Sequence, residues 1–150
     1  MNRGIMQAVP ATEESLPALQ AFPVRLLPGD DLRRALEACV AERRLSAAFV
    51  LAGIGSLKPA CIRLAGEEGA STLAGDLELL TLSGTIAASG SHLHASVSDA
   101  GGRIVGGHVA YGCTVRTTAE VLLGLLPGWR FTREVDARTG WAELVIGRSG

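Results

Sequence analysis

The sequence predicts an α+β domain in which one main helix packs on a central antiparallel sheet of about seven strands. Three observations predict this class: one amphipathic helical segment, several apolar segments of strand length, and tight turn signals between most of them. The chain has 150 residues, which suits one domain. Hydrophobic residues make up 47% of it, which excludes a mainly disordered chain.

One domain is expected at residues 22–147, between a flexible tail at 1–21 and a short C-terminal tail at 148–150. The first 21 residues contain one basic residue, two glutamates and two prolines but no continuous apolar block, so they do not resemble a secretion signal. No apolar run approaches the roughly 20 residues needed to span a bilayer. A cytoplasmic protein without membrane contact is therefore expected.

The helix is predicted at residues 30–44, after a strand at 22–27 and a Pro28-Gly29 turn. Asp30 is the expected N-cap, and Asp31 in the first turn suits the helix dipole. Apolar residues recur at the spacing of one buried helix face, namely Leu32, Ala35, Leu36, Cys39 and Val40. The charged residues are expected on a solvated, salt-bridged face, namely Arg33, Arg34, Glu37, Glu42, Arg43 and Arg44.

After the helix the pattern is typical of strands. The expected strands are 47–52, 60–64, 77–88, 92–98, 103–110, 121–126 and 141–146. Turns are expected at Gly53-Ile54-Gly55-Ser56, 66–69, 99–102 and 136–140, and a bend or bulge is expected at Ser83-Gly84. These strands carry more apolar surface than one helix can cover. A subunit interface is therefore expected on the uncovered face, with a second short helix as the alternative.

All three histidines fall within 17 positions of the chain, at His92, His94 and His108. A His-x-His pair on a strand places both imidazoles on one face. A hairpin can bring His108 beside them, and three neutral imidazoles around an open position suit zinc or another divalent transition metal. Polar-face histidines that only form hydrogen bonds are the alternative.

The hairpin register decides whether the three rings meet. If His94 faces His108, Ser98 pairs with Ile104 across a five-residue loop. A four-residue loop would place His108 opposite Leu93, on the wrong face. A bulge at Gly106-Gly107 could correct that mismatch, so the site is possible but not forced.

Few other residues of the chain form a recognisable catalytic or binding motif. Glu78 and Glu120 are possible carboxylate helpers, and so is Asp99. No phosphate-binding loop and no H-E-x-x-H motif occurs. The three cysteines are widely spaced and are expected to be small buried hydrophobic residues.

Four motifs, taken together, are specific enough to indicate a known protein family. They are Gly75-Asp76-Leu77-Glu78-Leu79-Leu80, His92-Leu93-His94, Gly106-Gly107-His108 and Thr117-Thr118-Ala119-Glu120-Val121. With these motifs the chain resembles the PPC (plants and prokaryotes conserved) domain over roughly residues 22–147. The resemblance implies a central antiparallel sheet and a homotrimer. Some prokaryotic relatives are thought to hold a metal on histidines that match His92, His94 and His108.

The resemblance also implies a connection with DNA. Plant members carry AT-hook motifs, built around R-G-R, that read the minor groove, whereas this chain contains no R-G-R segment. Its formal net charge of −1 opposes non-specific DNA binding. A DNA-associated or regulatory homotrimeric module, contacting itself and DNA or another protein, is the favoured hypothesis. The alternatives are a zinc-dependent enzyme acting on a small molecule and a purely structural trimer.

Overall fold

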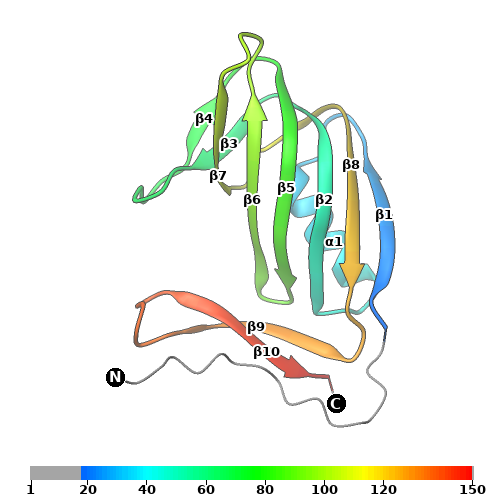
Figure 1. The fold of residues 1–150 in the computed structure, drawn as a ribbon. Helices are drawn as coiled ribbons and strands as arrows, with labels where there is room; N and C mark the ends of the chain where they lie inside the picture. The colour runs from blue at the N-terminus through cyan, green and yellow to red at the C-terminus, as the bar shows by residue number, and fades with distance from the viewer. Residues whose placement is uncertain (1–17, 150) are drawn as a thin grey trace.

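A computed structural model describes residues 18–149, which form one helix and ten strands (Figure 1). Eight strands form one antiparallel sheet in the order β1-β8-β2-β5-β6-β7-β3-β4, and β9 and β10 form a separate hairpin. The elements are β1 (Gln20–Leu26), α1 (Leu32–Glu42), β2 (Ala47–Leu57), β3 (Ala60–Arg63), β4 (Ser71–Leu73), β5 (Leu77–Ala87), β6 (Gly90–Ser98), β7 (Ile104–Val109), β8 (Val115–Leu125), β9 (Trp129–Val135) and β10 (Ala142–Arg148). The predicted fold class is confirmed, with eight rather than about seven strands in the central sheet.

The helix lies within the predicted segment 30–44 but is two residues shorter at each end, running from Leu32 to Glu42. Asp31 is the N-cap, and its carboxylate accepts a hydrogen bond from the Arg34 amide at 3.0 Å. Asp30 instead closes the preceding turn by accepting from the Leu27 amide at 2.8 Å. The expectation that Asp30 caps the helix is therefore wrong.

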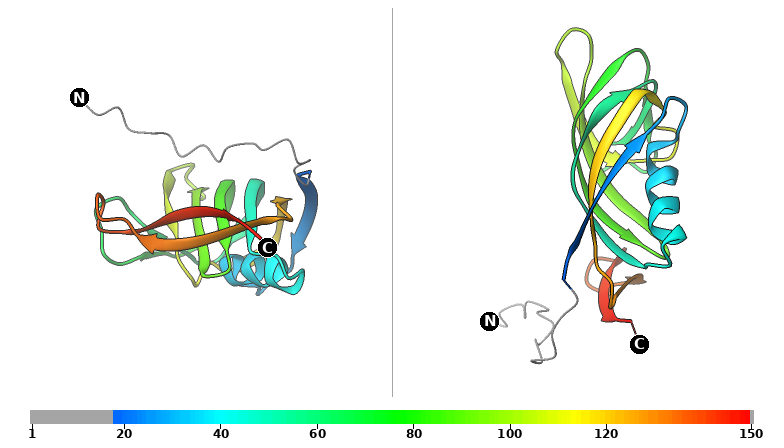
Figure 2. Two further views of the ribbon diagram at one scale, coloured as in Figure 1. Left: turned by 90° about the horizontal axis from the view of Figure 1, so that it is seen from below. Right: turned by 90° about the vertical axis from the view of Figure 1, so that its right-hand side faces the viewer.

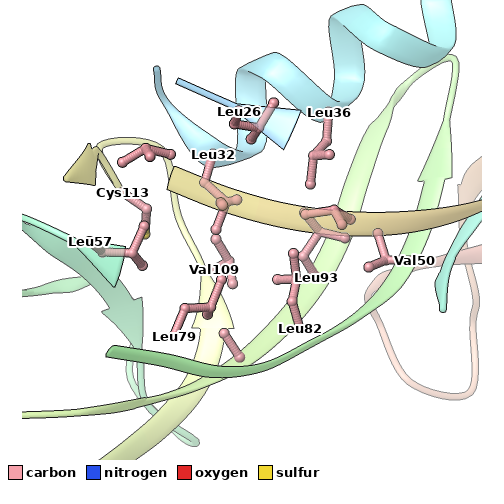
Figure 3. Packing of buried hydrophobic residues seen from close by; sticks show 14 of the residues in the cluster. Leu26, Leu32, Leu36, Val50, Leu57, Leu79, Leu82, Leu93, Val109 and Cys113 are labelled. Carbon is pink, nitrogen blue, oxygen red and sulfur yellow. The ribbon is translucent and has the colours of Figure 1, made fainter. Parts of the chain in front are cut away.

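The hydrophobic core lies between α1 and one face of the sheet (Figures 2 and 3). Leu32 and Leu36 on α1 have no exposed surface; Leu32 points toward Val109 of β7 and Leu36 toward Leu93 of β6 (Figure 3). Full burial of such a side chain stabilises the fold by about 2–3 kcal/mol. The alternation of β6 therefore sends Leu93, Ala95 and Val97 into this core and leaves the intervening residues on the opposite face.

The expected turn at residues 53–56 is part of β2, which runs unbroken from Ala47 to Leu57. The glycines there allow neighbouring strands to approach closely, because they have no Cβ atom. A Cβ on Gly53 would lie 2.8 Å from Cβ of Leu82, and one on Gly55 would collide with the Thr118 carbonyl oxygen. The glycines that predict a turn instead make room for neighbouring strands inside a sheet.

Strand β5 begins at the predicted residue and ends at Ala87, one residue before the predicted end. Its bulge falls between Leu79 and Thr81, not at Ser83-Gly84. Gly84 has a φ of +143°, and a Cβ there would collide with the carbonyl oxygen of His92 on β6. This glycine therefore permits the close pairing of β5 with the strand that carries two of the histidines.

Two strands, β4 and β9, were not predicted, and the described residues contain no second helix. The β9–β10 hairpin lies across one end of the large sheet (Figure 2). Its Phe131 is buried against Ala47 and Ala87 and meets the Phe49 ring edge-on at 5.6 Å. No helix in residues 18–149 is both long and apolar enough to cross a membrane.

Some residues predicted to lie in the two tails are instead part of strands. Most of the N-terminal tail lies outside the described residues, but Gln20 and Ala21 already pair with β8. Arg148 pairs with Trp129 in the terminal hairpin. Strand pairing in the described residues therefore begins at Gln20, two residues before the predicted start of the domain, and ends at Arg148.

The sheet face opposite α1 has no helix over it (Figure 2). Its side over β1, β8, β2 and part of β5 is apolar and includes Phe49, Leu51, Ile54, Leu80 and Leu122, all of which are exposed. A shallow depression of about 630 Å³ runs across Pro23, Ile54 and Leu122 in this region. We refer to these five exposed residues as the apolar half of the open face.

Substitution of Gly84 by alanine should destabilise the protein by at least about 2 kcal/mol, because it combines a positive φ with a backbone collision. Gly102→Ala is the matched control, since Gly102 also has a positive φ (+78°) but its Cβ would meet nothing within 4 Å. Urea unfolding measures both variants. Equal losses of stability in the two would contradict the role assigned to the β5–β6 approach.

Candidate metal centre

The structure brings the three histidines together on the open face. His92 and His94 project from β6, and His94 is paired directly with His108 on β7. Ser98 pairs with Ile104, so the loop contains the five residues 99–103. This is the register that unites the rings, and it was one of those the sequence left open.

The geometry of the three rings suits one metal ion. One nitrogen from each ring lies within 4.8 Å of the other two. The Nε2 atoms of His92 and His94 are 3.0 Å apart. Nitrogens bound to a tetrahedral zinc at 2.0–2.1 Å would be separated by about 3.3 Å, a spacing that lies between the 3.0 Å and 4.8 Å found here.

The hairpin turn fixes the register. The Asp99 carboxylate accepts hydrogen bonds from the Gly101 and Arg103 amides, each at 2.9 Å. The Asp99 amide in turn donates to the Arg103 carbonyl oxygen at 3.0 Å. Asp99 was a possible metal helper, but its carboxylate closes this loop instead.

A glycine next to His108 lets the neighbouring strand approach. A Cβ on Gly107 would lie 2.6 Å from the carbonyl oxygen of Arg63 on β3. The pairing of β6 with β7 runs without a bulge through Gly106 and Gly107. The possible bulge at these glycines is therefore absent, and Arg63 pairs directly with His108.

Helix α1 holds the two histidine strands from the core side. The Arg33 guanidinium donates to the carbonyl oxygens of Ser91 at 2.7 Å and Val109 at 3.2 Å, which are the residues adjacent to His92 and His108. Glu37 accepts from the Ser91 amide at 3.0 Å. Arg33 and Glu37 form an ion pair, as expected of a salt-bridged face, but both side chains are largely buried rather than solvated.

The environment of the rings favours neutral imidazole. Burial lowers the pKa of His108 to about 4, and the neighbouring His92 and Arg63 add to this effect. Burial, followed by the charge of Arg133, also lowers the pKa of His92. Because a metal binds only neutral imidazole, protons compete weakly for both rings near pH 7.

The terminal hairpin adds two charged groups to the histidine site. A pocket of about 270 Å³ is lined by His92 and His94 on one side and by Arg133 of β9 and Glu143 of β10 on the other. Sequence reasoning missed both residues. The turn at 136–140 predicted a final strand, but nothing in the pattern indicated which part of the sheet the hairpin would meet.

The glutamates proposed as helpers lie elsewhere. Glu78 and Glu120 line a different pocket on the open face, together with Ile54. Glu78 pairs with Ser98, four residues along β6 from His94, which corresponds to about 13 Å. The structure therefore brings the three histidines together but does not bring these glutamates to them.

Solved structures of other proteins share this fold. A hypothetical protein from Salmonella enterica is 40% identical, with a TM-score of 0.83 over 89% of this chain and 99% of that one. A protein from Archaeoglobus fulgidus described as metal-containing is 26% identical, with a TM-score of 0.70 over 91% of this chain and 99% of that one. A protein from Ralstonia eutropha, provisionally described as DNA-binding, is 25% identical with a TM-score of 0.65, covering 85% of this chain and 90% of that one.

Among curated proteins, the chain is 43% identical over 145 residues to the bifunctional protein GlmU of Synechococcus sp. (strain JA-2-3B'a(2-13)). That match covers 95% of this chain but only 23% of that protein, so the chain spans less than a quarter of this relative's length. The model of the Plants and Prokaryotes Conserved (PCC, also written PPC) domain matches residues 13–127. The chain therefore belongs to the Plants and Prokaryotes Conserved domain family.

Proposed function

We propose that this chain is a metal-binding domain that self-associates through the apolar half of its open face. The observation that carries the proposal is the convergence of three imidazole nitrogens within 4.8 Å on one side of the sheet. Zinc fits this donor set best, because imidazole is one of its preferred ligands. Three protein ligands leave one position of a tetrahedral ion for water or another molecule.

The proposal that the domain self-associates is supported by the uncovered apolar surface. Ile54 is 56% exposed and Leu122 is 36% exposed on a sheet face that no helix of the described chain covers. Contiguous apolar surface of this kind is typical of protein interfaces. The occupant we propose is a second and third copy of the chain, in line with the homotrimer that the family resemblance implies.

A regulatory role on DNA is supported only by the descriptions of related structures. The charge of this chain opposes direct contact, since its net charge is −1. Lys58 and Arg116 are also both bound to the Asp76 carboxylate, at 2.9 Å each. If the domain acts in DNA regulation, we expect it to do so by contacting another protein.

Metal-dependent chemistry on a small molecule is the second candidate function. It is favoured by the pocket beside the histidines, where Glu143 accepts a hydrogen bond from the Thr139 hydroxyl at 3.0 Å. A zinc ion bound there would lower the pKa of its water. Glu143 is better placed than Glu78 or Glu120 to accept a proton at this pocket.

Purified, untagged protein should bind about one zinc ion per chain. The double variant His92→Ala/His94→Ala should lose stoichiometric binding, because only His108 would remain as a ligand. Ser96→Ala is the control, since Ser96 lies on the same face of β6 but outside the cluster. Elemental analysis after dialysis measures the metal. Equal metal content in wild type and the double variant would contradict the site.

The stability of the metal-free protein should fall as the pH drops from 7.5 to 5. His108 has a pKa of about 4 in the folded state against 6.5 in the unfolded chain, so the unfolded state binds more protons between these values. The contribution is therefore fully present above about pH 6.5 and is lost progressively toward pH 4. Urea unfolding in the presence of a chelator measures it. His108→Asn should flatten this dependence, and an unchanged slope would contradict it.

Ile54→Asp should shift the protein from trimer to monomer, because it places a charge in the centre of the proposed interface. Leu64→Asp, at an exposed position (41%) just after β3, should leave the assembly unchanged. Light scattering coupled to size-exclusion chromatography gives the masses, and circular dichroism checks folding. A monomeric wild type, or a trimeric Ile54→Asp variant, would overturn the proposed interface.

A further inference from the structure

Arg133 lies at the histidine pocket and forms no salt bridge within residues 18–149. Its guanidinium donates one hydrogen bond, from Nη2 to the Thr85 hydroxyl at 2.8 Å. Its Nε atom is buried and has no acceptor among the described residues. Within residues 18–149, no carboxylate lies within 4.0 Å of this guanidinium. A half-buried cation with an unmet donor is costly to keep unless something else satisfies it.

The metal site would make this charge imbalance larger. A divalent ion on three neutral imidazoles would add two positive charges beside Arg133. A second arginine, Arg63, lies next to His108 on the other side of the cluster. Glu143 is the one acidic residue that lines the pocket. Positive charge would therefore exceed negative charge around this pocket, and such a site attracts an anion.

The pocket also has the size and the polar groups that a small anion needs. Its volume is about 270 Å³, slightly below the roughly 300–1,000 Å³ typical of pockets for drug-sized ligands. Ser83 and Thr85 contribute hydroxyl groups to its wall. A guanidinium presents planar donors that match the oxygens of a carboxylate or a phosphate.

We propose that this pocket binds a small molecule with a carboxylate or phosphate group, held between Arg133 and a metal on the three histidines. This inference rests on the proposed metal site and extends it by naming the ligand class. Arg133 is then the residue that selects anionic ligands. The metal's open position and the guanidinium would hold the same anionic group from two sides.

The test uses full-length protein loaded with cobalt(II), whose visible absorption reports both metal binding and changes in its ligands. Acetate and inorganic phosphate are titrated separately, so that the response distinguishes the two anions, and acetamide is the uncharged control. At least one anion should change the cobalt spectrum in a saturable manner, whereas acetamide should not. Arg133→Gln should weaken that binding about tenfold or more while leaving cobalt binding intact.

Two further variants keep the result decisive. Arg130→Gln removes an exposed arginine from the same strand and should bind the anion as wild type does. Arg133→Lys keeps the positive charge and should bind the anion more tightly than Arg133→Gln does. Absence of cobalt bands in wild type would refute the metal site and this inference with it. Cobalt bands that no anion perturbs, or equal anion affinity in Arg133→Gln and wild type, would refute the anion site alone.

Discussion

The pairing of His94 with His108 across two neighbouring strands is the constraint on which the candidate site depends. A shift of one residue would turn His108 to the core face and separate it from the other two rings. Two sets of hydrogen bonds stabilise this register, one in the hairpin loop and one from the helix. The Asp99 carboxylate closes the five-residue loop, and Arg33 reaches from the helix to the carbonyl groups beside His92 and His108. The helix therefore stabilises the core and also helps to fix the strand pairing that brings the histidines together.

The two faces of the sheet have different roles. One face packs against α1 and forms a continuous hydrophobic core. The open face is apolar over β1, β8 and β2 and polar over β6, where alternation places histidines and serines. The β9–β10 hairpin lies at the end of this face and brings Arg133 and Glu143 to the histidines. One sheet thus carries both an apolar region that favours association and a polar region that favours ligand binding. Both regions lie on the open face, because alternate side chains of each strand point away from the core.

Sequence patterns predicted those features that depend on residues close together in the chain. The spacing of Leu32, Leu36 and Val40 identified the helix, and the alternation around His92 and His94 identified both the strand and its polar face. Patterns failed where a residue's role is set by a distant neighbour. Gly53 and Gly55 look like a turn, but they make room for Leu82 and Thr118 on adjacent strands. Arg133 and Glu143 could not be connected with the histidines, because the position of the terminal hairpin depends on packing around Phe131. Glu78 and Glu120 were chosen for their charge and lie by a different pocket.

X-ray absorption spectroscopy at the zinc edge, on protein loaded with one equivalent of zinc, would identify the ligands of the ion. We expect three imidazole nitrogens at about 2.0–2.1 Å, with a non-protein ligand completing the coordination shell. In His108→Ala the imidazole count should fall, because the third ring comes from the opposite strand of the hairpin. A wild-type shell dominated by sulfur or carboxylate ligands, or an imidazole count that does not change when His108 is removed, would contradict the convergence of these strands on one ion.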